Sequence, residues 1–156
     1  MRVLCPIGQR NGPKLVQRLA EVLGKQADVL LLHVVDTGPR HDLKHLIEGL
    51  RHGPHGSTER DHELSRAEEN AAETSLAETK VTAETLGFNV QVRIAKGRAE
   101  EVIMEIARNE SVSLICISAR EGLEGHPHIG PASVGHTARF VVDHAPCDVL
   151  LLRERT

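Results

Sequence analysis

Residues 29–35, VLLLHVV, limit most strongly what this chain can fold into. A strand with one face in water alternates apolar and polar residues, whereas this run is apolar at six of its seven positions. Such a run is typical of a central strand in a parallel sheet whose two faces are both covered by helices. His33, the single polar residue of the run, is expected to be a hydrogen-bonded core residue.

Further strand and helix patterns alternate along the chain. The period-two pattern of residues 88–94, FNVQVRI, predicts an edge strand with one wet face. Right-handed crossovers between the strands then give a mainly parallel sheet with helices on both faces, an α/β fold. The other predicted strands are residues 2–7, 112–118 and 149–152. The predicted helices are residues 13–23, 61–86 and 132–143, and a short helix after Gly97 that carries Val102, Ile103 and Ile106.

Two of these helices have apolar faces that should pack on the sheet. The first is well marked, and the second is thin and rich in alanine, which suggests close packing on the sheet or partial burial. Their expected inner residues are Leu15, Val16, Leu19, Val22 and Leu23 in the first, and Leu64, Ala67, Ala71, Leu76, Ala83 and Leu86 in the second.

Length and composition indicate one cytoplasmic domain, residues 1–156. The net charge of -3 and the presence of only two aromatic residues disfavour nucleic-acid binding. No apolar run approaches the roughly 20 residues of a membrane span, and the chain does not open on a signal peptide. Cys5, Cys116 and Cys147 include no Cys-x-x-Cys pair and are expected to be reduced, buried thiols.

The last third of the chain offers the main functional lead. An apolar run ending near Ser118 leads into a loop holding Gly122, Gly125 and Gly135, and a helix follows. A strand, a Gly-rich loop and a helix start place backbone N–H groups where a phosphate can bind. The glycines equally permit a long loop to turn, so a ligand site and a plain connection both remain open. In a parallel sheet this loop should meet the loops at Gly8 and Asp36.

Other site chemistries are disfavoured. The chain contains neither a Walker A lysine motif nor Gly-x-Gly-x-x-Gly after the first strand, and its loops lack the aromatic residues that would stack on a flavin. Its ten histidines form no convincing ligand set, so no metal is predicted. Ser133, His136 and Asp143 lack the context of a nucleophile elbow, and no catalytic residue is assigned.

The chain resembles the universal stress proteins over essentially its whole length. The matching landmarks are VLCPIG in the first strand, LLLHVVD in the second, GRAEEVIMEIARNESVSLICIS, and the C-terminal VGHTARFVVDHAPCDVLLLR. The resemblance implies a Rossmann-like, adenine nucleotide alpha hydrolase-like fold: a five-stranded parallel sheet of order 3-2-1-4-5.

The resemblance also implies an adenine-nucleotide crevice for ATP or AMP. ATP-holding members carry Gly-x2-Gly-x9-Gly-(Ser/Thr), and Gly122, Gly125 and Gly135 fit that spacing, but His136 replaces the hydroxyl residue and Thr137 comes one position late. Gly8 stands where such members carry an Asp that contacts adenine. The ATP motif is therefore expected to be degraded. The residues expected to line the crevice are Pro6, Ile7, Gly8, Val34, Ser118, Gly122, Gly125, Gly135, His136 and Thr137.

The resulting hypothesis is a non-enzymatic, cytoplasmic stress-response protein that binds a small ligand. The resemblance implies a homodimer joined through the last strand, residues 147–153, whose apolar edge needs a cover. Two alternatives remain: an interaction protein without a ligand that binds a protein partner through its dimer and residues 36–87, and a weak ATP-binding or ATP-hydrolysing member.

Overall fold

A computed structural model of the chain describes residues 1–8, 11–24, 26–36, 58–119 and 134–153. In these residues strands and helices alternate, as the sequence predicts. The elements are β1 (Arg2–Pro6), α1 (Gly12–Leu23), β2 (Asp28–Asp36), α3 (Thr58–Thr85), β3 (Asn89–Gly97), α4 (Ala99–Asn109), β4 (Leu114–Ser118), α5 (His136–His144) and β5 (Asp148–Leu152).

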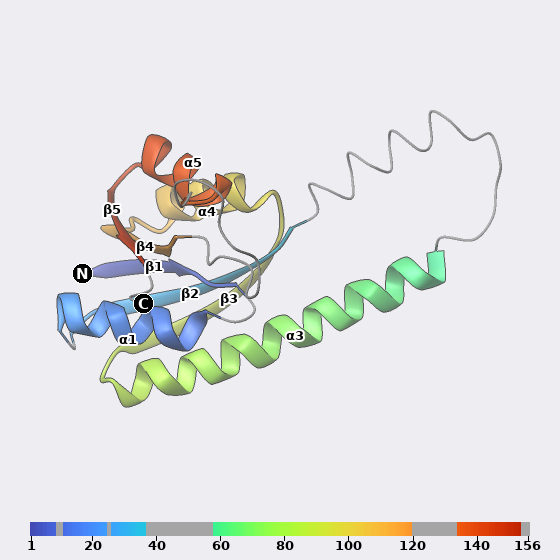
Figure 1. The fold of residues 1–156 in the computed structure, drawn as a ribbon, viewed down its shortest axis with the longest axis horizontal. Coiled ribbons are helices and arrows are strands. Elements are labelled where there is room, and N and C mark those ends of the chain that lie inside the picture. Colours follow the sequence, from blue (N-terminus) through green and yellow to red (C-terminus); the bar gives the residue numbers. More distant parts are fainter. Residues whose placement is uncertain (9–10, 25, 37–57, 120–133, 154–156) are drawn as a thin grey trace, which may run out of the picture.

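The five strands form one sheet of order β3-β2-β1-β4-β5 (Figure 1). Every neighbouring pair is parallel, and β1 lies between β2 and β4. The predicted topology is confirmed, including the position of β3 at an edge. Val92 and Ile94 of β3 are 47% and 37% exposed, which fits an edge strand only partly covered by helices.

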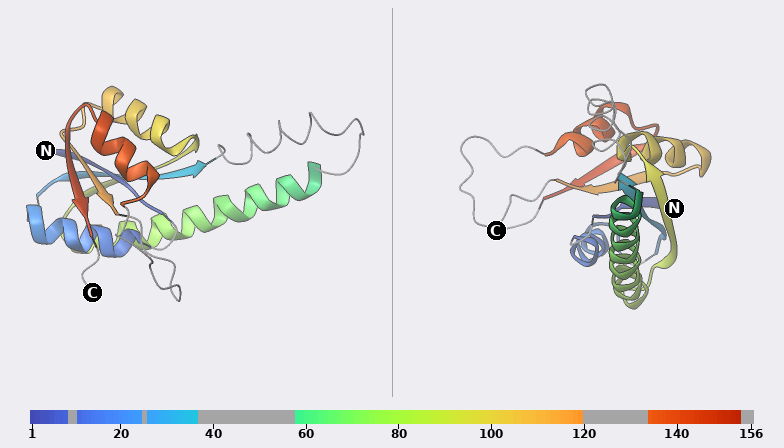
Figure 2. Two further views of the ribbon diagram at one scale, coloured as in Figure 1. Left: turned by 45° about the horizontal axis from the view of Figure 1, so that its top comes forward. Right: turned by 90° about the vertical axis from the view of Figure 1, so that its right-hand side faces the viewer.

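Helices cover both faces of the sheet, with α1 and α3 on one side and α4 and α5 on the other (Figure 2). The alternation of side chains along β1 divides the core in two: Val3 and Cys5 belong to the cluster under α1 and α3, and Leu4 to the cluster under α4 and α5. All three side chains are fully buried. The predicted central strand, β2, likewise contributes Leu31 to the first cluster and Leu32 to the second.

The inner face of α3 differs from the prediction. Ala67 and Ala71 are exposed, and the side chain of Leu64 lies outside the described residues. Leu76 and Ala83 are buried as predicted, and Ala72, Ser75 and Thr79 complete the buried face. Two of these residues are polar, but their hydroxyls donate hydrogen bonds to backbone oxygens, Thr79 to Ser75 O at 2.7 Å and Ser75 to Gly8 O at 3.1 Å. Because only apolar residues were assigned to the predicted face, Ser75 and Thr79 were left out of it.

Two smaller predictions on helices are also wrong. Val22 at the end of α1 is 51% exposed, because the buried face of α1 is carried by Leu15, Val16 and Leu19. The last helix begins at His136 rather than near residue 132. Gly135 has a φ of 90°, a conformation outside the right-handed helix, so helical geometry starts only after it.

The three cysteines are free thiols, as expected. Cys5 and Cys116, on neighbouring strands β1 and β4, are fully buried in the same cluster, whereas Cys147 is only partly buried. The thiol of Cys116, together with burial, raises the pKa of Cys5 well above its usual value. These two cysteines therefore act as apolar core residues.

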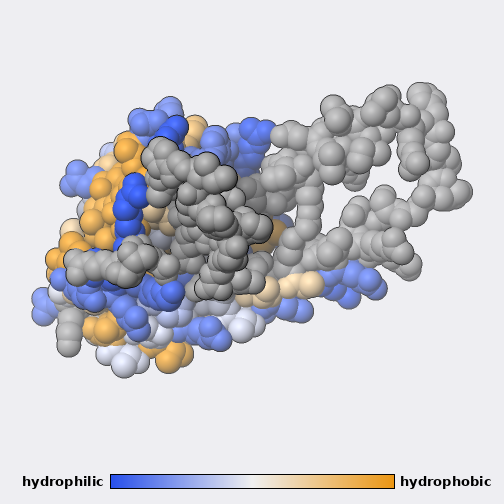
Figure 3. All heavy atoms as spheres, viewed as in Figure 1, coloured by the Kyte–Doolittle hydropathy of each residue, from blue (hydrophilic) through white to orange (hydrophobic). Residues whose placement is uncertain are grey.

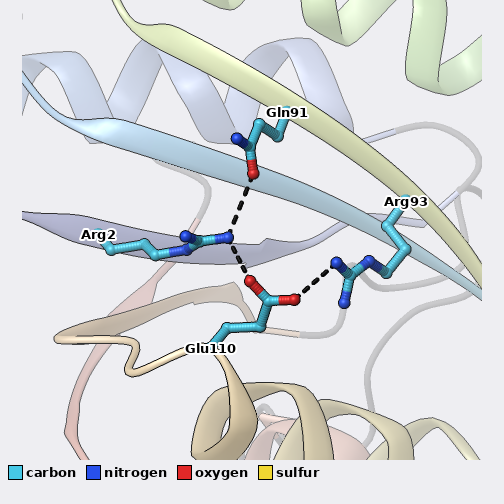
Figure 4. A network of polar contacts seen from close by, with 4 residues as sticks. All are labelled: Arg2, Gln91, Arg93 and Glu110. Carbon is cyan, nitrogen blue, oxygen red and sulfur yellow. Dashed lines mark hydrogen bonds and ion pairs between the residues drawn. The ribbon is translucent and has the colours of Figure 1, made fainter.

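A polar network fastens the edge strand β3 to β1 across β2 (Figure 4). Arg2 donates to the side chain of Gln91 at 3.2 Å and pairs with Glu110, which follows α4. The second carboxylate oxygen of Glu110 lies 2.6 Å from the guanidinium of Arg93. Arg93, and to a lesser extent Arg2, hold the pKa of Glu110 below its usual value.

Candidate functional site

The candidate site lies at the carboxyl ends of β1, β2 and β4. The strand order reverses at β1: β2 and β3 follow on one side of it, and β4 and β5 follow on the other. In open parallel sheets this switch point is where ligands bind. The tips of β1 and β4 meet there, as predicted, whereas β2 continues past the level of Pro6, from Leu32 to Asp36, paired with β3.

The tip of β1 carries three of the predicted site residues, Pro6, Ile7 and Gly8. Pro6 is in register with Leu32 of β2, and the N–H of Ile7 donates to Leu32 O at 2.8 Å. Ile7 is buried at 5% exposure, so its side chain belongs to the core. Gly8 is the first exposed residue of the tip.

Ser118, at the end of β4, is joined to the tip of β1 by a residue that the sequence analysis did not select. Asn11 accepts a hydrogen bond from the N–H of Gly8 at 2.8 Å and donates one to the hydroxyl of Ser118. Two predicted site residues that are 110 positions apart in the sequence are thus brought together by one carboxamide.

The apolar side of the site comes from β2. Val34 is partly buried and packs against the cluster under α4 and α5, as do Val102 of α4 and Val134 before α5. An apolar surface beside a few polar groups is the usual composition of a small-molecule site.

The start of α5 holds the remaining described residues, Gly135, His136 and Thr137. Gly135 is the N-cap and Thr137 is partly buried, whereas the His136 side chain is 80% exposed. His136 Nε2 lies 3.6 Å from a carboxylate oxygen of Glu100, a residue of α4 that is only 17% exposed. A carboxylate thus lies beside the first side chain of α5. Gly122 and Gly125 lie outside the described residues.

His33 lies on β2 near the tip of β1. The ring is 7% exposed, as expected of a core histidine, and its Nδ1 has no hydrogen-bond partner among the described residues. Burial lowers the pKa of His33, and a hydrogen bond with the Ile7 backbone partly offsets this. Burial therefore disfavours the protonated form of the ring.

Within the described ranges no three His, Cys, Asp or Glu side chains are placed to hold a metal ion. Of the disfavoured serine-hydrolase set, His136 and Asp143 lie on the same helix, α5, and Ser133 is outside the described residues. Across the part of the chain covered by the structure, no helix is both long and apolar enough to cross a membrane.

The comparison with protein families decides the family. The model of the universal stress protein family matches residues 1–153. The chain belongs to this family. No curated protein sequence matches it.

Solved structures of universal stress proteins share its fold. UspA from Lactobacillus plantarum is 24% identical and superposes with a TM-score of 0.70, the match covering 98% of this chain and 97% of that one. The protein from Archaeoglobus fulgidus in complex with dAMP is 14% identical, with a TM-score of 0.61 and coverage of 97% and 96%. A family member from Arabidopsis thaliana with AMP bound is 15% identical, with a TM-score of 0.64 and coverage of 100% and 93%.

Sequence reasoning missed three residues that shape the site of this universal stress protein: Asn11, Ser75 and Glu100. Asn11 precedes Gly-Pro at a helix start, a pattern that indicates an N-cap and so hides its link to Ser118. Ser75 lies in a long polar helix, and Glu100 fits the usual preference for acid in a first helical turn. In each case a common local explanation concealed a contact distant in sequence.

Proposed function

We propose that this universal stress protein is a non-catalytic, cytoplasmic stress-response protein that holds an adenine nucleotide in the crevice, and that it prefers AMP to ATP. The observation that supports this most directly is the link from Gly8 through Asn11 to Ser118. This link holds polar groups from the tips of β1 and β4 together at the switch point. Val34 of β2 supplies apolar surface there. A purine base needs this combination of an apolar wall and a few polar contacts. The AMP and dAMP complexes of the two related folds make an adenine nucleotide the natural ligand class.

The phosphates are expected to point toward the start of α5. Backbone N–H groups at a helix start attract one phosphate. A triphosphate brings more charge close to the Glu100 carboxylate, and His136 occupies the position at which ATP-holding members carry a hydroxyl. Losing a hydrogen bond to a charged group costs about 1.5–3 kcal/mol, so ATP should bind at least about tenfold more weakly than AMP.

Calorimetric titration with AMP, ADP and ATP, with and without Mg²⁺, tests this proposal. We expect heat with AMP, weaker binding of ATP, and an ATP affinity that improves when Glu100→Gln removes the carboxylate. Glu105→Gln is the matched control, since Glu105 is an exposed residue of the same helix. If no nucleotide gives heat at millimolar concentration, the ligand proposal is wrong. Phosphate release in the same samples tests the alternative of weak ATP hydrolysis.

The protein is further proposed to be a homodimer joined through β5 and its flanks, residues 147–153. β5 is an edge strand. Its residues Val149, Leu150 and Leu151 are only partly buried, whereas Leu152 is buried. Hydrophobic atoms gather on the side of the molecule where β5 lies (Figure 3). An edge of this kind gains from pairing with a second copy, which would cover its backbone groups and side chains.

Leu150→Lys should shift the mass measured by light scattering from dimer toward monomer. Val81→Lys is the matched control, because Val81 is 64% exposed on α3, far along the chain from β5. Circular dichroism must first show that both variants are folded, since Leu150 also packs on the core. A Leu150→Lys protein that remains a dimer would exclude this interface.

A second candidate function is binding of a protein partner through residues 36–87. The first half of α3 extends away from the sheet (Figure 1), and Ala67 and Ala71 are exposed on it. Residues 37–57 lie outside the described part. Ala71→Glu should abolish capture of such a partner in a pull-down. Val22→Glu, at an exposed position of α1, is the control and should leave capture unchanged. Equal capture by both variants would count against this candidate.

A further inference from the structure

Asn11 does not do what its position predicts. It is the N-cap of α1, where an asparagine side chain normally accepts a hydrogen bond from an N–H of the first turn. Here the side chain makes no such capping bond. Its carbonyl oxygen instead accepts from Gly8 N–H, and its amide group donates to Ser118. A common local preference is given up for a link between the tips of two strands, which is the kind of exception found at functional sites.

The backbone on either side of this link is held in place. Ile7 N–H donates to Leu32 O at 2.8 Å, and the Gly8 carbonyl accepts from the hydroxyl of Ser75 on α3 at 3.1 Å. On the other tip, Ala119 N–H donates to Leu152 O at 2.8 Å. Since both tips are anchored, the Asn11 side chain is the part of this link that can move without breaking strand pairing.

The carboxamide also resembles part of the proposed ligand. Its edge presents one acceptor beside one donor, as does the edge of adenine formed by N1 or N7 and the 6-amino group. The Gly8 N–H offers a donor, and the Ser118 hydroxyl can accept. Asn11 therefore uses the same pair of groups that an adenine lying across these tips would use.

We propose that Asn11 is a built-in competitor of the nucleotide: its side chain closes the crevice between Gly8 and Ser118 and must swing away before a base can bind there. This inference rests on the proposed function of the same site. It makes Asn11 a residue that sets affinity, because each nucleotide that binds must break both of its hydrogen bonds.

The test compares wild type with Asn11→Ala, Asn11→Asp and Asn70→Ala. Asn11→Ala removes the competitor. An aspartate can still accept from the Gly8 N–H and the Ser118 hydroxyl, so Asn11→Asp keeps the crevice closed. Asn70→Ala removes an exposed asparagine of α3 and controls for the loss of a carboxamide elsewhere. Two quantities are measured: the hydrogen-exchange rate of the Gly8 amide without ligand, and the Kd for AMP.

We expect the Gly8 amide to exchange faster in Asn11→Ala alone, and AMP to bind at least about fivefold more tightly to that variant, as two hydrogen bonds of about 0.5–1.5 kcal/mol need no longer be broken. Asn11→Asp should bind AMP no better than wild type, and this holds as a test even if Asn11→Ala fails to fold. Equal AMP affinity in wild type and Asn11→Ala, or tighter binding by Asn11→Asp, would overturn the competition while leaving the proposed function intact. Absence of AMP binding in every variant would overturn both.

Discussion

Gly12→Ala should destabilise this protein, although alanine is normally preferred to glycine in a helix. Gly12 begins α1 at the place where α3 crosses it. A Cβ at this position would lie 2.0 Å from Thr79 Oγ1 and 3.1 Å from both Thr79 Cβ and Cγ2. Thr79 is fully buried, and its hydroxyl donates to Ser75 O at 2.7 Å. Rotating the threonine to relieve the clash would break this hydrogen bond and leave its own Cβ at 3.1 Å.

The magnitude follows from two opposing effects. Overpacking of a core costs about 1–3 kcal/mol. The helix preference for alanine over glycine returns at most about 1 kcal/mol. Because the clash falls on a buried, hydrogen-bonded hydroxyl, the overpacking cost should lie in the upper part of its range, about 2–3 kcal/mol. The free energy of unfolding should therefore fall by about 1–2 kcal/mol, which lowers Tm by about 2–4 °C per kcal/mol in a domain of this size. Adding Thr79→Ala removes the two branch atoms, so the double variant should be less destabilised than the sum of the single ones, by about 1 kcal/mol.

Urea unfolding of the wild type, the two single variants and the double variant measures this coupling. Gly8→Ala is the matched control. Its Cβ would meet nothing closer than Asn11 Oδ1 at 3.4 Å, an ordinary contact. We expect that variant to stay within about 0.5 kcal/mol of wild type. If Gly12→Ala were as stable as wild type, or if the four free energies were additive, the close approach of α1 and α3 would not be the reason for glycine here.

Two predictions concern pH. The folded-state pKa of Glu110 is lowered, so its ion pairs stabilise the fold above the unfolded-state pKa of about 4.3 and are lost as pH falls through the folded value. The stability difference between wild type and Glu110→Gln should therefore shrink between about pH 6 and pH 3, and a constant difference in the urea midpoint would argue against it. The folded-state pKa of His33 is also lowered, but here the folded state excludes the proton, so stability should fall as the solution is acidified below about pH 6.5. His33→Leu should lose part of this acid sensitivity, and identical urea midpoints against pH for the two proteins would contradict it.

The fold could be predicted because its signals are local and repeated. The apolar run of β2 and the alternating pattern of β3 each identify the kind of strand they form. On α3 the exposed Ala67 and Ala71 lie on the half of the helix that extends away from the sheet (Figure 1). The missed Ser75 and Thr79 are polar in the sequence yet buried with their hydroxyls satisfied by backbone oxygens. Periodicity of apolar residues cannot detect a face that is partly built from such residues.

The site was predictable only where it coincides with strand ends. Gly8 and Ser118 follow from the topology, because the carboxyl ends of neighbouring parallel strands must lie together, whereas Val34 was expected from the family resemblance. Asn11 and Glu100 could not be found in this way. Each acts through a contact with a residue distant in sequence, and each also has an ordinary local reason to be where it is.

The polar network of Arg2, Gln91, Arg93 and Glu110 makes the β3 edge of the sheet different from the β5 edge. To separate from β2, β3 must also give up the hydrogen bond between Gln91 and Arg2 of β1 and the ion pair between Arg93 and Glu110. β3 also carries Arg93 and Lys96, charges that discourage a foreign strand from joining it. Because one edge carries these charges and the opposite edge is apolar, we expect edge-to-edge pairing of copies to stop at a dimer and not to continue into a fibre.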